Sequence, residues 1–136
     1  MKLSTRFRYG TRLMINLALN YNKGPVILKS VAKTEKVSKK YLEQIVIKLM
    51  SANLVKSVRG PKGGYVLAKP PNKIKIIEIY NILEKTPVLV PCLKRPSVCS
   101  LVKTCTAREM WQKMQEDIFS QLTKNTLSDL AKQKLN

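Results

Sequence analysis

Apolar residues in the first 85 positions recur at helical spacing, and this pattern predicts four helices there. Three of them lie outside residues 37–68. The first helix is expected over residues 5–21, and its apolar stripe consists of Phe7, Met14, Leu17, Ala18 and Tyr21. A break at Gly24-Pro25 precedes a short helix expected over residues 28–36. Another helix is expected over residues 74–85, where isoleucines dominate the apolar positions.

Residues 37–68 combine the remaining helix with a β-hairpin. Ser38 is a favourable N-cap, and the inward face of the helix consists of Leu42, Ile45, Val46 and Leu49. The opposite face carries Lys39, Lys40, Glu43, Gln44 and Ile47. Strand-forming residues then flank a glycine-rich turn at residues 59–64, which predicts a hairpin.

A cationic hairpin that directly follows a helix with a polar, cationic start is typical of a winged helix-turn-helix. Such a helix enters the DNA major groove, and the hairpin reaches the backbone or the neighbouring minor groove. The alternative is a plain surface helix followed by a solvated hairpin. The pattern therefore predicts a mainly α fold with a β-hairpin wing, in which residues 1–85 form the DNA-binding domain.

The C-terminal part is expected to contain a loop and a long helix. Residues 86–105 hold three prolines and three cysteines with little periodicity, which predicts an irregular loop. From Thr106 a long helix follows, and its apolar seam consists of Ala107, Trp111, Met114, Ile118 and Leu122. We expect residues 106–136 to provide a dimerisation helix and a frayed tail from residue 129. The alternative is that the helix packs on its own domain.

The formal net charge of +18 is concentrated in the segment that contains the helix and hairpin. Residues 1–75 carry +15, whereas residues 76–136 carry only +3. A localised basic excess on a folded segment indicates a polyanionic partner, and nucleic acid is the first candidate. A membrane surface is the alternative, but no basic helix with a strongly hydrophobic face is found that would lie in one. A membrane-spanning helix is not expected, because no apolar run approaches the roughly 18 residues of a membrane span. No signal-peptide pattern is found either, so a cytoplasmic location is expected.

The residue types argue against an enzyme. The chain has no histidine, no phosphate-cradling loop and no paired-carboxylate site. A structural RNA-binding protein, such as a ribosomal component, is the alternative from another class. Such a protein would carry basic tails and no long dimer seam, whereas the basic charge here lies on the folded part.

The three cysteines, Cys92, Cys99 and Cys105, lie within fourteen residues at the spacing Cys-x6-Cys-x5-Cys. Thiolates are soft ligands that suit iron–sulfur clusters, zinc and Cu(I). The spacing is wider than the Cys-x2-Cys knuckle of structural zinc sites, and it suits a loop wrapped around a larger object. The alternative is three unconnected cysteines.

Several stretches together carry a family signature. They are Tyr41-Leu42-Glu43-Gln44, the wing LVKSVRGPKGGY at residues 54–65, the three cysteines, and Trp111 followed by Leu127-Ser128-Asp129-Leu130. These stretches resemble the IscR/NsrR/RirA/CymR family of bacterial transcriptional regulators. The resemblance runs from residue 3 to about residue 130, and the three-cysteine loop is specific for the cluster-binding members.

The resemblance implies a homodimer of winged helix-turn-helix subunits, joined by crossed long helices and bound to a double-stranded DNA operator. Residues 38–50 correspond to the recognition helix, and Arg59 corresponds to the wing arginine that enters the minor groove. The implied DNA-binding residues are Ser38, Lys39, Lys40, Tyr41, Glu43, Gln44, Arg59, Gly60, Pro61 and Lys62. The implied metal ligands are Cys92, Cys99 and Cys105, which would hold an iron–sulfur cluster, either [4Fe-4S] or [2Fe-2S].

Two departures from the family pattern leave the fourth ligand open. Arg108 stands where IscR-like members have a histidine, and Phe7-Arg8-Tyr9 stands where NsrR-like members have an aspartate. Glu109, Glu43, a backbone group, water or a small thiol remain candidates. We therefore expect a regulator whose operator affinity is controlled by a cluster that senses iron, oxygen or redox state, or nitric oxide. The alternative within DNA binding is a regulator that senses by cysteine oxidation or through another metal.

Overall fold

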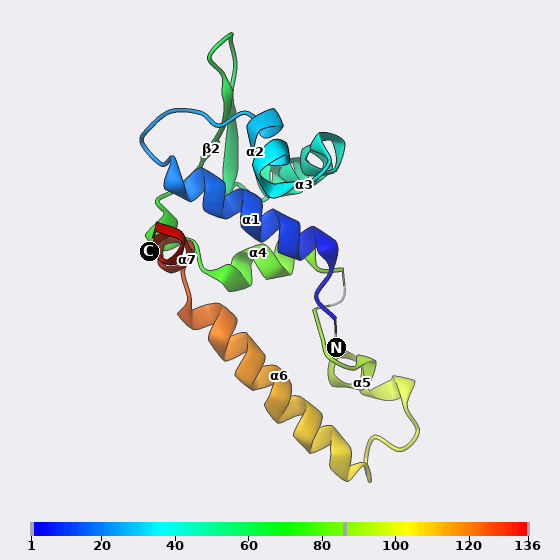
Figure 1. Ribbon diagram of the computed structural model, residues 1–136. Helices are drawn as coiled ribbons and strands as arrows, with labels where there is room; N and C mark the ends of the chain where they lie inside the picture. The colour runs from blue at the N-terminus through cyan, green and yellow to red at the C-terminus, as the bar shows by residue number, and fades with distance from the viewer. Residues whose placement is uncertain (1, 86, 136) are drawn as a thin grey trace.

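The computed structural model describes residues 2–85 and 87–135, which form a mainly helical body with one two-stranded antiparallel sheet (Figure 1). The elements in chain order are α1 (Thr5–Leu19), α2 (Leu28–Glu35), α3 (Lys39–Ser51), β1 (Val55–Val58), β2 (Gly64–Leu67), η1 (Pro71–Lys73), α4 (Ile76–Leu83), α5 (Pro91–Lys94), η2 (Pro96–Val98), α6 (Thr106–Lys124) and α7 (Leu127–Leu135). This arrangement confirms the winged helix-turn-helix fold and the long C-terminal helix predicted from the sequence.

Helix α1 lies at the centre of the body and contacts α2, α3, α4, α7 and β2. Ser4 caps the N-terminus of this helix, because its Oγ accepts a hydrogen bond from the Phe7 backbone N–H at 3.1 Å. Met14 and Leu17 of the predicted apolar stripe, together with the neighbouring Leu13, are at most 1% exposed. Burying each such side chain contributes about 2 kcal/mol, so α1 organises the core. The helix ends at Leu19, two residues before the expected boundary.

Helices α2 and α3 form the helix-turn-helix. Lys36, directly after α2, has a left-handed backbone with φ of 56°, which reverses the chain direction. Ser38 caps α3, because its Oγ accepts a hydrogen bond from the Tyr41 backbone N–H at 3.3 Å. The four residues predicted to face inward, Leu42, Ile45, Val46 and Leu49, are all at most 1% exposed. The amphipathic interpretation of this helix is confirmed.

The predicted hairpin forms from β1 and β2, with Val55 opposite Leu67 and Val58 opposite Gly64. A third segment is bridged to β2 one residue from the turn-side end of the hairpin. The backbone groups of Val26 and Tyr65 exchange two hydrogen bonds, of 2.9 and 2.8 Å. Because this bridge ties β2 to the segment before α2, the tip of the hairpin projects from the body in a defined direction (Figure 1).

The C-terminal segment differs from the expected frayed tail. Residues 127–135 form α7, which packs against α1 with Leu127 fully buried and Ala131 7% exposed. The Leu127 N–H donates to the Ile74 carbonyl at 2.8 Å, so this helix is joined to the chain just before α4. At this junction Ile74 and Lys75 have an extended backbone conformation. Helix α4 is therefore shorter than the helix predicted over residues 74–85.

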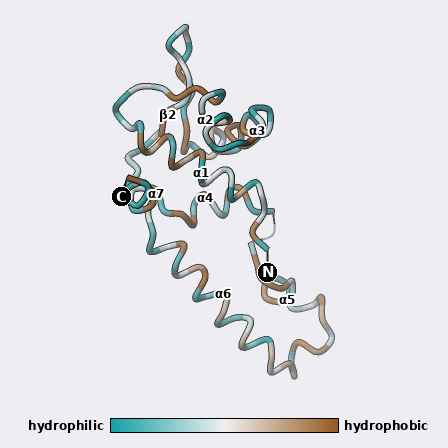
Figure 2. The backbone as a smooth tube through the Cα atoms, in the orientation of Figure 1, coloured by the Kyte–Doolittle hydropathy of each residue, from teal (hydrophilic) through white to brown (hydrophobic). Residues whose placement is uncertain are grey.

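The segment between α4 and α6 is less irregular than predicted. Its described residues, 87–105, contain the single turns α5 and η2, each of which begins with a proline. Thr86 lies outside the described residues. Helix α6 extends away from the body (Figure 1), and hydrophobic and hydrophilic positions alternate along it (Figure 2). No residue of this helix is buried. Neither α6 nor any other described helix is long and apolar enough to cross a membrane.

A carboxylate at the end of α2 joins three helices. The Glu35 side chain is only 9% exposed and accepts hydrogen bonds from Arg12 at 2.7 Å, Asn16 at 2.9 Å and Lys134 at 3.0 Å. Burial alone would raise the pKa of Glu35, but these hydrogen bonds outweigh it and lower the pKa from 4.5 to about 2. Glu35 therefore remains ionised and ties α2 to both α1 and α7.

The packing of α7 predicts that Leu127→Ala destabilises the protein. Loss of this fully buried side chain should lower the free energy of unfolding by about 2–5 kcal/mol. Leu135→Ala is the matched control, because Leu135 is 76% exposed in the same helix and should change stability by less than about 0.5 kcal/mol. Urea unfolding at one protein concentration measures both. Equal stability of the two variants would mean that α7 is not part of the core.

The Glu35 hydrogen bonds predict a specific acid sensitivity. The pKa of Glu35 is lower in the folded state, so its contribution is present above about pH 4.5 and is lost as the pH falls towards 2. Over this range the wild type should lose about 3 kcal/mol more stability than Glu35→Gln. Urea unfolding as a function of pH tests this, with Asp117→Asn as an exposed control. Parallel pH curves for wild type and Glu35→Gln would contradict the assignment.

Candidate nucleic-acid interface and cysteine loop

The outward face of α3 presents the polar residues predicted from the sequence. Lys39, Lys40, Glu43, Gln44 and Ile47 are all exposed, on the side opposite the buried leucines and valine. The Lys39 Nζ lies 3.6 Å from the Glu43 Oε1, and both side chains are about half exposed. Such surface pairs are weak, so both groups remain able to exchange this partner for another.

Tyr41 lies at the edge of this face and packs against α1. Its ring meets Tyr9 edge-on at 6.0 Å between centroids, and its hydroxyl lies 3.2 Å from the Thr5 Oγ1. The guanidinium groups of Arg8 and Arg12 lie 5.9 and 5.5 Å from the Tyr9 centroid. Helix α1 therefore adds two cations beside the start of α3. Sequence reasoning did not predict these arginines as site residues, because their approach to α3 depends on how the helices cross.

The tip of the wing carries the other predicted contacts. Arg59, Gly60, Pro61 and Lys62 are all exposed. Gly60 has a φ of +110°, a conformation that L side chains rarely adopt, and its carbonyl accepts from the Gly63 N–H at 2.9 Å. A Cβ atom at Gly63 would clash with the Val58 carbonyl. The glycines thus allow a tight turn that leaves Arg59 and Lys62 in solvent.

The electrostatics of this region are strongly cationic. Among residues 1–75 the only acidic residues are Glu35 and Glu43, against 17 lysines and arginines. Glu35 is largely buried and already paired with Arg12 and Lys134. Glu43 is therefore the one acidic side chain exposed on the α3 and wing surface, and the surrounding field favours a polyanion.

The three cysteines lie on three different parts of the loop. Cys92 belongs to α5 and Cys99 follows η2, and both are half-buried, whereas Cys105 is the exposed N-cap residue of α6. Within residues 2–85 and 87–135, no three histidine, cysteine, aspartate or glutamate side chains gather closely enough to hold a metal ion. The sequence therefore predicted a suitable set of soft donors, but the described conformation does not bring the three thiols together.

Arg108 occupies the position where IscR-like members have a histidine ligand, and here its side chain holds the cysteine loop against α6. Its Nη2 donates to the Cys92 carbonyl at 3.3 Å. Its Nε is buried and has no hydrogen-bond partner among the described residues. The donor types of the loop fit an iron–sulfur cluster, but the arrangement of the cysteines does not, and gathering them would require the loop to move.

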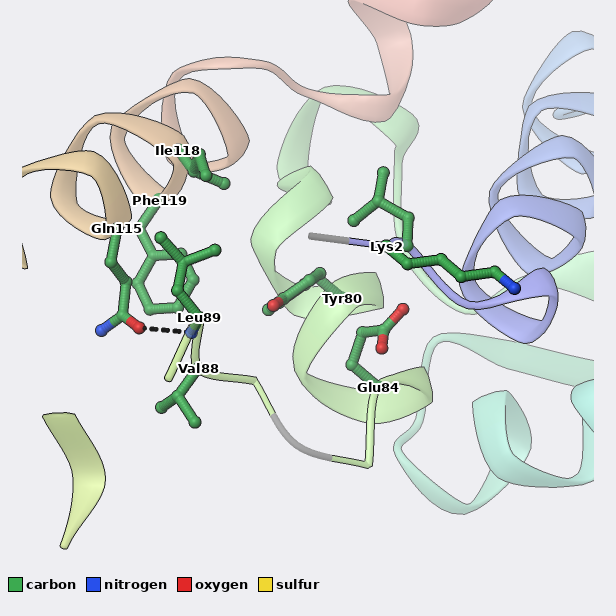
Figure 3. A pocket seen from close by; sticks show the side chains of 9 residues that line it. Lys2, Tyr80, Glu84, Val88, Leu89, Gln115, Ile118 and Phe119 are labelled. Carbon is green, nitrogen blue, oxygen red and sulfur yellow. Dashed lines mark hydrogen bonds between the residues drawn. The ribbon is translucent and has the colours of Figure 1, made fainter. Parts of the chain in front are cut away.

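A cavity that was not predicted from the sequence lies where α6 meets the body (Figure 3). Its volume is about 150 Å³, and its walls include Tyr80, Glu84, Leu89, Gln115 and Phe119. The Tyr80 and Phe119 rings pack edge-on at 5.7 Å, and the Leu89 N–H donates to the Gln115 Oε1 at 2.9 Å. Burial, with a further contribution from the Glu84 carboxylate, raises the pKa of Tyr80 above its usual value. These contacts connect α4, the cysteine loop and α6.

Comparison with known proteins gives a consistent result over nearly the whole chain. Residues 3–133 match the model of the Rrf2 family, which is described as an iron-dependent transcriptional regulator. The chain is 41% identical over 133 residues to the HTH-type transcriptional regulator CymR of Bacillus subtilis, covering 96% of this chain and 90% of that protein.

Solved structures agree in fold. The structure of CymR (YrzC), named as the global cysteine regulator of B. subtilis, superposes with a TM-score of 0.83 at 40% identity, covering 97% of each chain. T. potens IscR superposes with a TM-score of 0.81 at 36% identity, covering 98% of this chain and 88% of that one. The resemblance identified from the wing and recognition-helix motifs is therefore confirmed.

Proposed function

The chain belongs to the Rrf2 family of transcriptional regulators, and we propose that it reads a specific duplex DNA operator through α3 and the wing, under control of its cysteine loop. The observation that carries this proposal is the exposed polar face of α3 beside an exposed cationic wing, on a body whose charge is concentrated there. Family membership favours this regulator over the structural RNA-binding alternative.

In the proposed complex, α3 lies in the major groove and the wing reaches the minor groove. Lys40 and Gln44 are positioned on the outward face for phosphate and base contacts, with Glu43 as an acceptor for a cytosine amino group. Arg59 at the wing tip suits a narrow minor groove, where the negative potential is strongest. The cations of α1, Arg8 above all, extend the phosphate-binding surface beyond the residues expected from the sequence.

A second copy of the chain is the proposed partner for α6. Met110 is 52% exposed and Met114 is 45% exposed, and no residue of this helix is buried. Beside it an open, mostly apolar groove is lined by Val88, Leu89, Pro91, Lys94, Arg95 and Val98. The cations of this groove complement the acidic side chains that α6 carries, such as Glu109 and Glu116. The C-terminal half of the helix packs partly on its own body through Phe119, so the proposed contact with a second copy uses the N-terminal half of the seam.

For the sensor, we propose an iron–sulfur cluster held by Cys92, Cys99 and Cys105 after rearrangement of the loop. The support is the set of three soft donors in one loop and the iron dependence in the family description. Cluster type and fourth ligand stay open.

A second candidate is thiol oxidation in the same loop. The separate placement of the thiols, with Cys105 exposed at the start of α6, favours it, and the similar CymR protein is named as a cysteine regulator. In both candidate mechanisms, the sensing residues are Cys92, Cys99 and Cys105.

We predict that Arg59→Ala weakens operator binding by about 1–3 kcal/mol, because a minor-groove arginine contributes both charge and shape recognition. The wild type should also lose affinity steeply as salt rises, because phosphate contacts release counterions. Fluorescence anisotropy with an operator isolated from genomic fragments measures both. Lys103→Ala, which removes an exposed cation from the cysteine loop, is the control. Equal losses in both variants would contradict a specific role of the wing.

We predict that Met114→Glu yields monomers without unfolding the chain. The side chain is 45% exposed, so the change costs the single subunit little, whereas a charge buried in an interface without a partner costs several kcal/mol. Light scattering measures the mass, and circular dichroism checks the fold. A dimer of unchanged stability would place the interface elsewhere on the surface.

The cluster proposal is tested by anaerobic purification, followed by iron and sulfide analysis and visible absorption. Iron and acid-labile sulfide should be present in the wild type and absent from the Cys92→Ala, Cys99→Ala, Cys105→Ala variant. Operator affinity should then differ between loaded and unloaded wild type by about 1–3 kcal/mol, the usual size of an allosteric coupling. Reconstituted wild type without iron or sulfide would reject the cluster, and a response to peroxide that the triple variant lacks would favour thiol oxidation.

A further inference from the structure

Ile47 is exceptional among the branched apolar residues of α3. Leu42, Ile45, Val46 and Leu49 are each at most 1% exposed, because they form the inward face of the helix. Ile47 is 63% exposed.

The position of Ile47 is the centre of the outward face rather than its edge. It lies one helical turn after Glu43 and Gln44, two turns after Lys40, and one turn before Ser51. All four of these residues are exposed. Ile47 is not among the partly buried residues that pack against the core, so it contributes nothing to the packing of the body.

An isoleucine is an unfavourable choice for an exposed helix position in structural terms. Its β-branched side chain lowers helix propensity relative to lysine, glutamine or glutamate, and an exposed apolar side chain gains nothing from burial. The chain uses polar residues at the neighbouring outward positions 40, 43, 44 and 51. The apolar exception therefore fits a contact with a binding partner.

The surroundings identify the chemistry of that partner. The outward face is cationic, which favours a polyanion over an apolar protein surface or a lipid. The major groove of duplex DNA exposes one apolar group on its base edges, the 5-methyl group of thymine. A helix that lies in the groove with this face inward brings Ile47 to that group.

We propose that Ile47 is a specificity-determining residue that recognises the 5-methyl group of a thymine in each half-site of the operator. This inference rests on the proposed function, because it requires α3 to lie in the major groove. It adds an apolar reading element to the polar ones, and it distinguishes thymine from cytosine at one position without a hydrogen bond.

The experiment begins with selection from a randomised duplex library by the wild type, Ile47→Ala and Leu135→Ala. Leu135→Ala is the matched control, because it removes an exposed apolar side chain, 76% exposed, from a helix remote from α3. The wild type and the control should select the same site. Ile47→Ala should relax selection for one thymine in each half-site and leave the other positions unchanged.

The decisive step removes only the methyl group. Each thymine of the selected site is replaced in turn by deoxyuridine, and affinity is measured for the wild type, Ile47→Ala and Ile47→Val. At one position the wild type should lose about fourfold per half-site, the factor that burial of one methyl group supplies, and about fifteenfold with both half-sites changed. Ile47→Ala should lose nothing at that position, and Ile47→Val should behave like the wild type.

The possible failures are distinguishable. If the wild type selects no sequence, the proposed function fails and the inference fails with it. If the wild type selects a site but deoxyuridine lowers the affinity of wild type and Ile47→Ala equally at every position, the inference alone is overturned. Thermal unfolding of the Ile47 variants checks the fold, and because the position is exposed, their unfolding should match that of the wild type.

Discussion

Burial of one face of α1 is the constraint on which the rest of the structure depends. This helix contacts α2, α3, α4, α7 and β2, and its Leu13 and Met14 are completely buried. Gly10 allows α4 to approach closely, because a Cβ atom there would clash with Leu83. With the apolar face of α3 held against this core, its polar face has to point outward. The orientation of the proposed DNA-reading surface is therefore a consequence of core packing.

The spacing of apolar residues predicted the helices that bury one face against this core. It was insufficient for segments whose structure depends on contacts with residues far away in the sequence. The outward residues of α3 could be predicted from the sequence. Apolar residues such as Leu42 and Ile45 identify the buried face of the helix, so the residues on the opposite face must be exposed. Helix α7 could not be predicted in this way, because its order depends on Ile74 and on the pairing of Lys134 with Glu35, 99 residues away. The spacing of the cysteines indicated soft donors, but spacing alone does not determine the path of a loop through space.

The junction between the loop and the body is where a signal from the cysteines would act. The loop connects α4 to α6 along the chain, and Arg108 ties its α5 turn to the first turn of α6 through the Cys92 carbonyl. Further along α6, the Leu89–Gln115 hydrogen bond ties the middle of this helix to the loop, and the Tyr80–Phe119 contact fixes it to α4 of the body. In the proposed mechanism, a rearrangement that gathers the three thiols changes the angle between α6 and the body, and with it the spacing of the two DNA-reading heads in a dimer.

The central claim is that α3 and the wing, rather than the basic chain as a whole, form the DNA-binding surface. Lysine acetylation of the protein with and without operator duplex, read by mass spectrometry, tests it directly, because exposed lysines occur on α3 and the wing as well as on α6 and α7. The account predicts that the duplex protects Lys39, Lys40 and Lys62 and leaves Lys113, Lys124 and Lys132 on α6 and α7 reactive. Protection of the second group without the first would contradict the account.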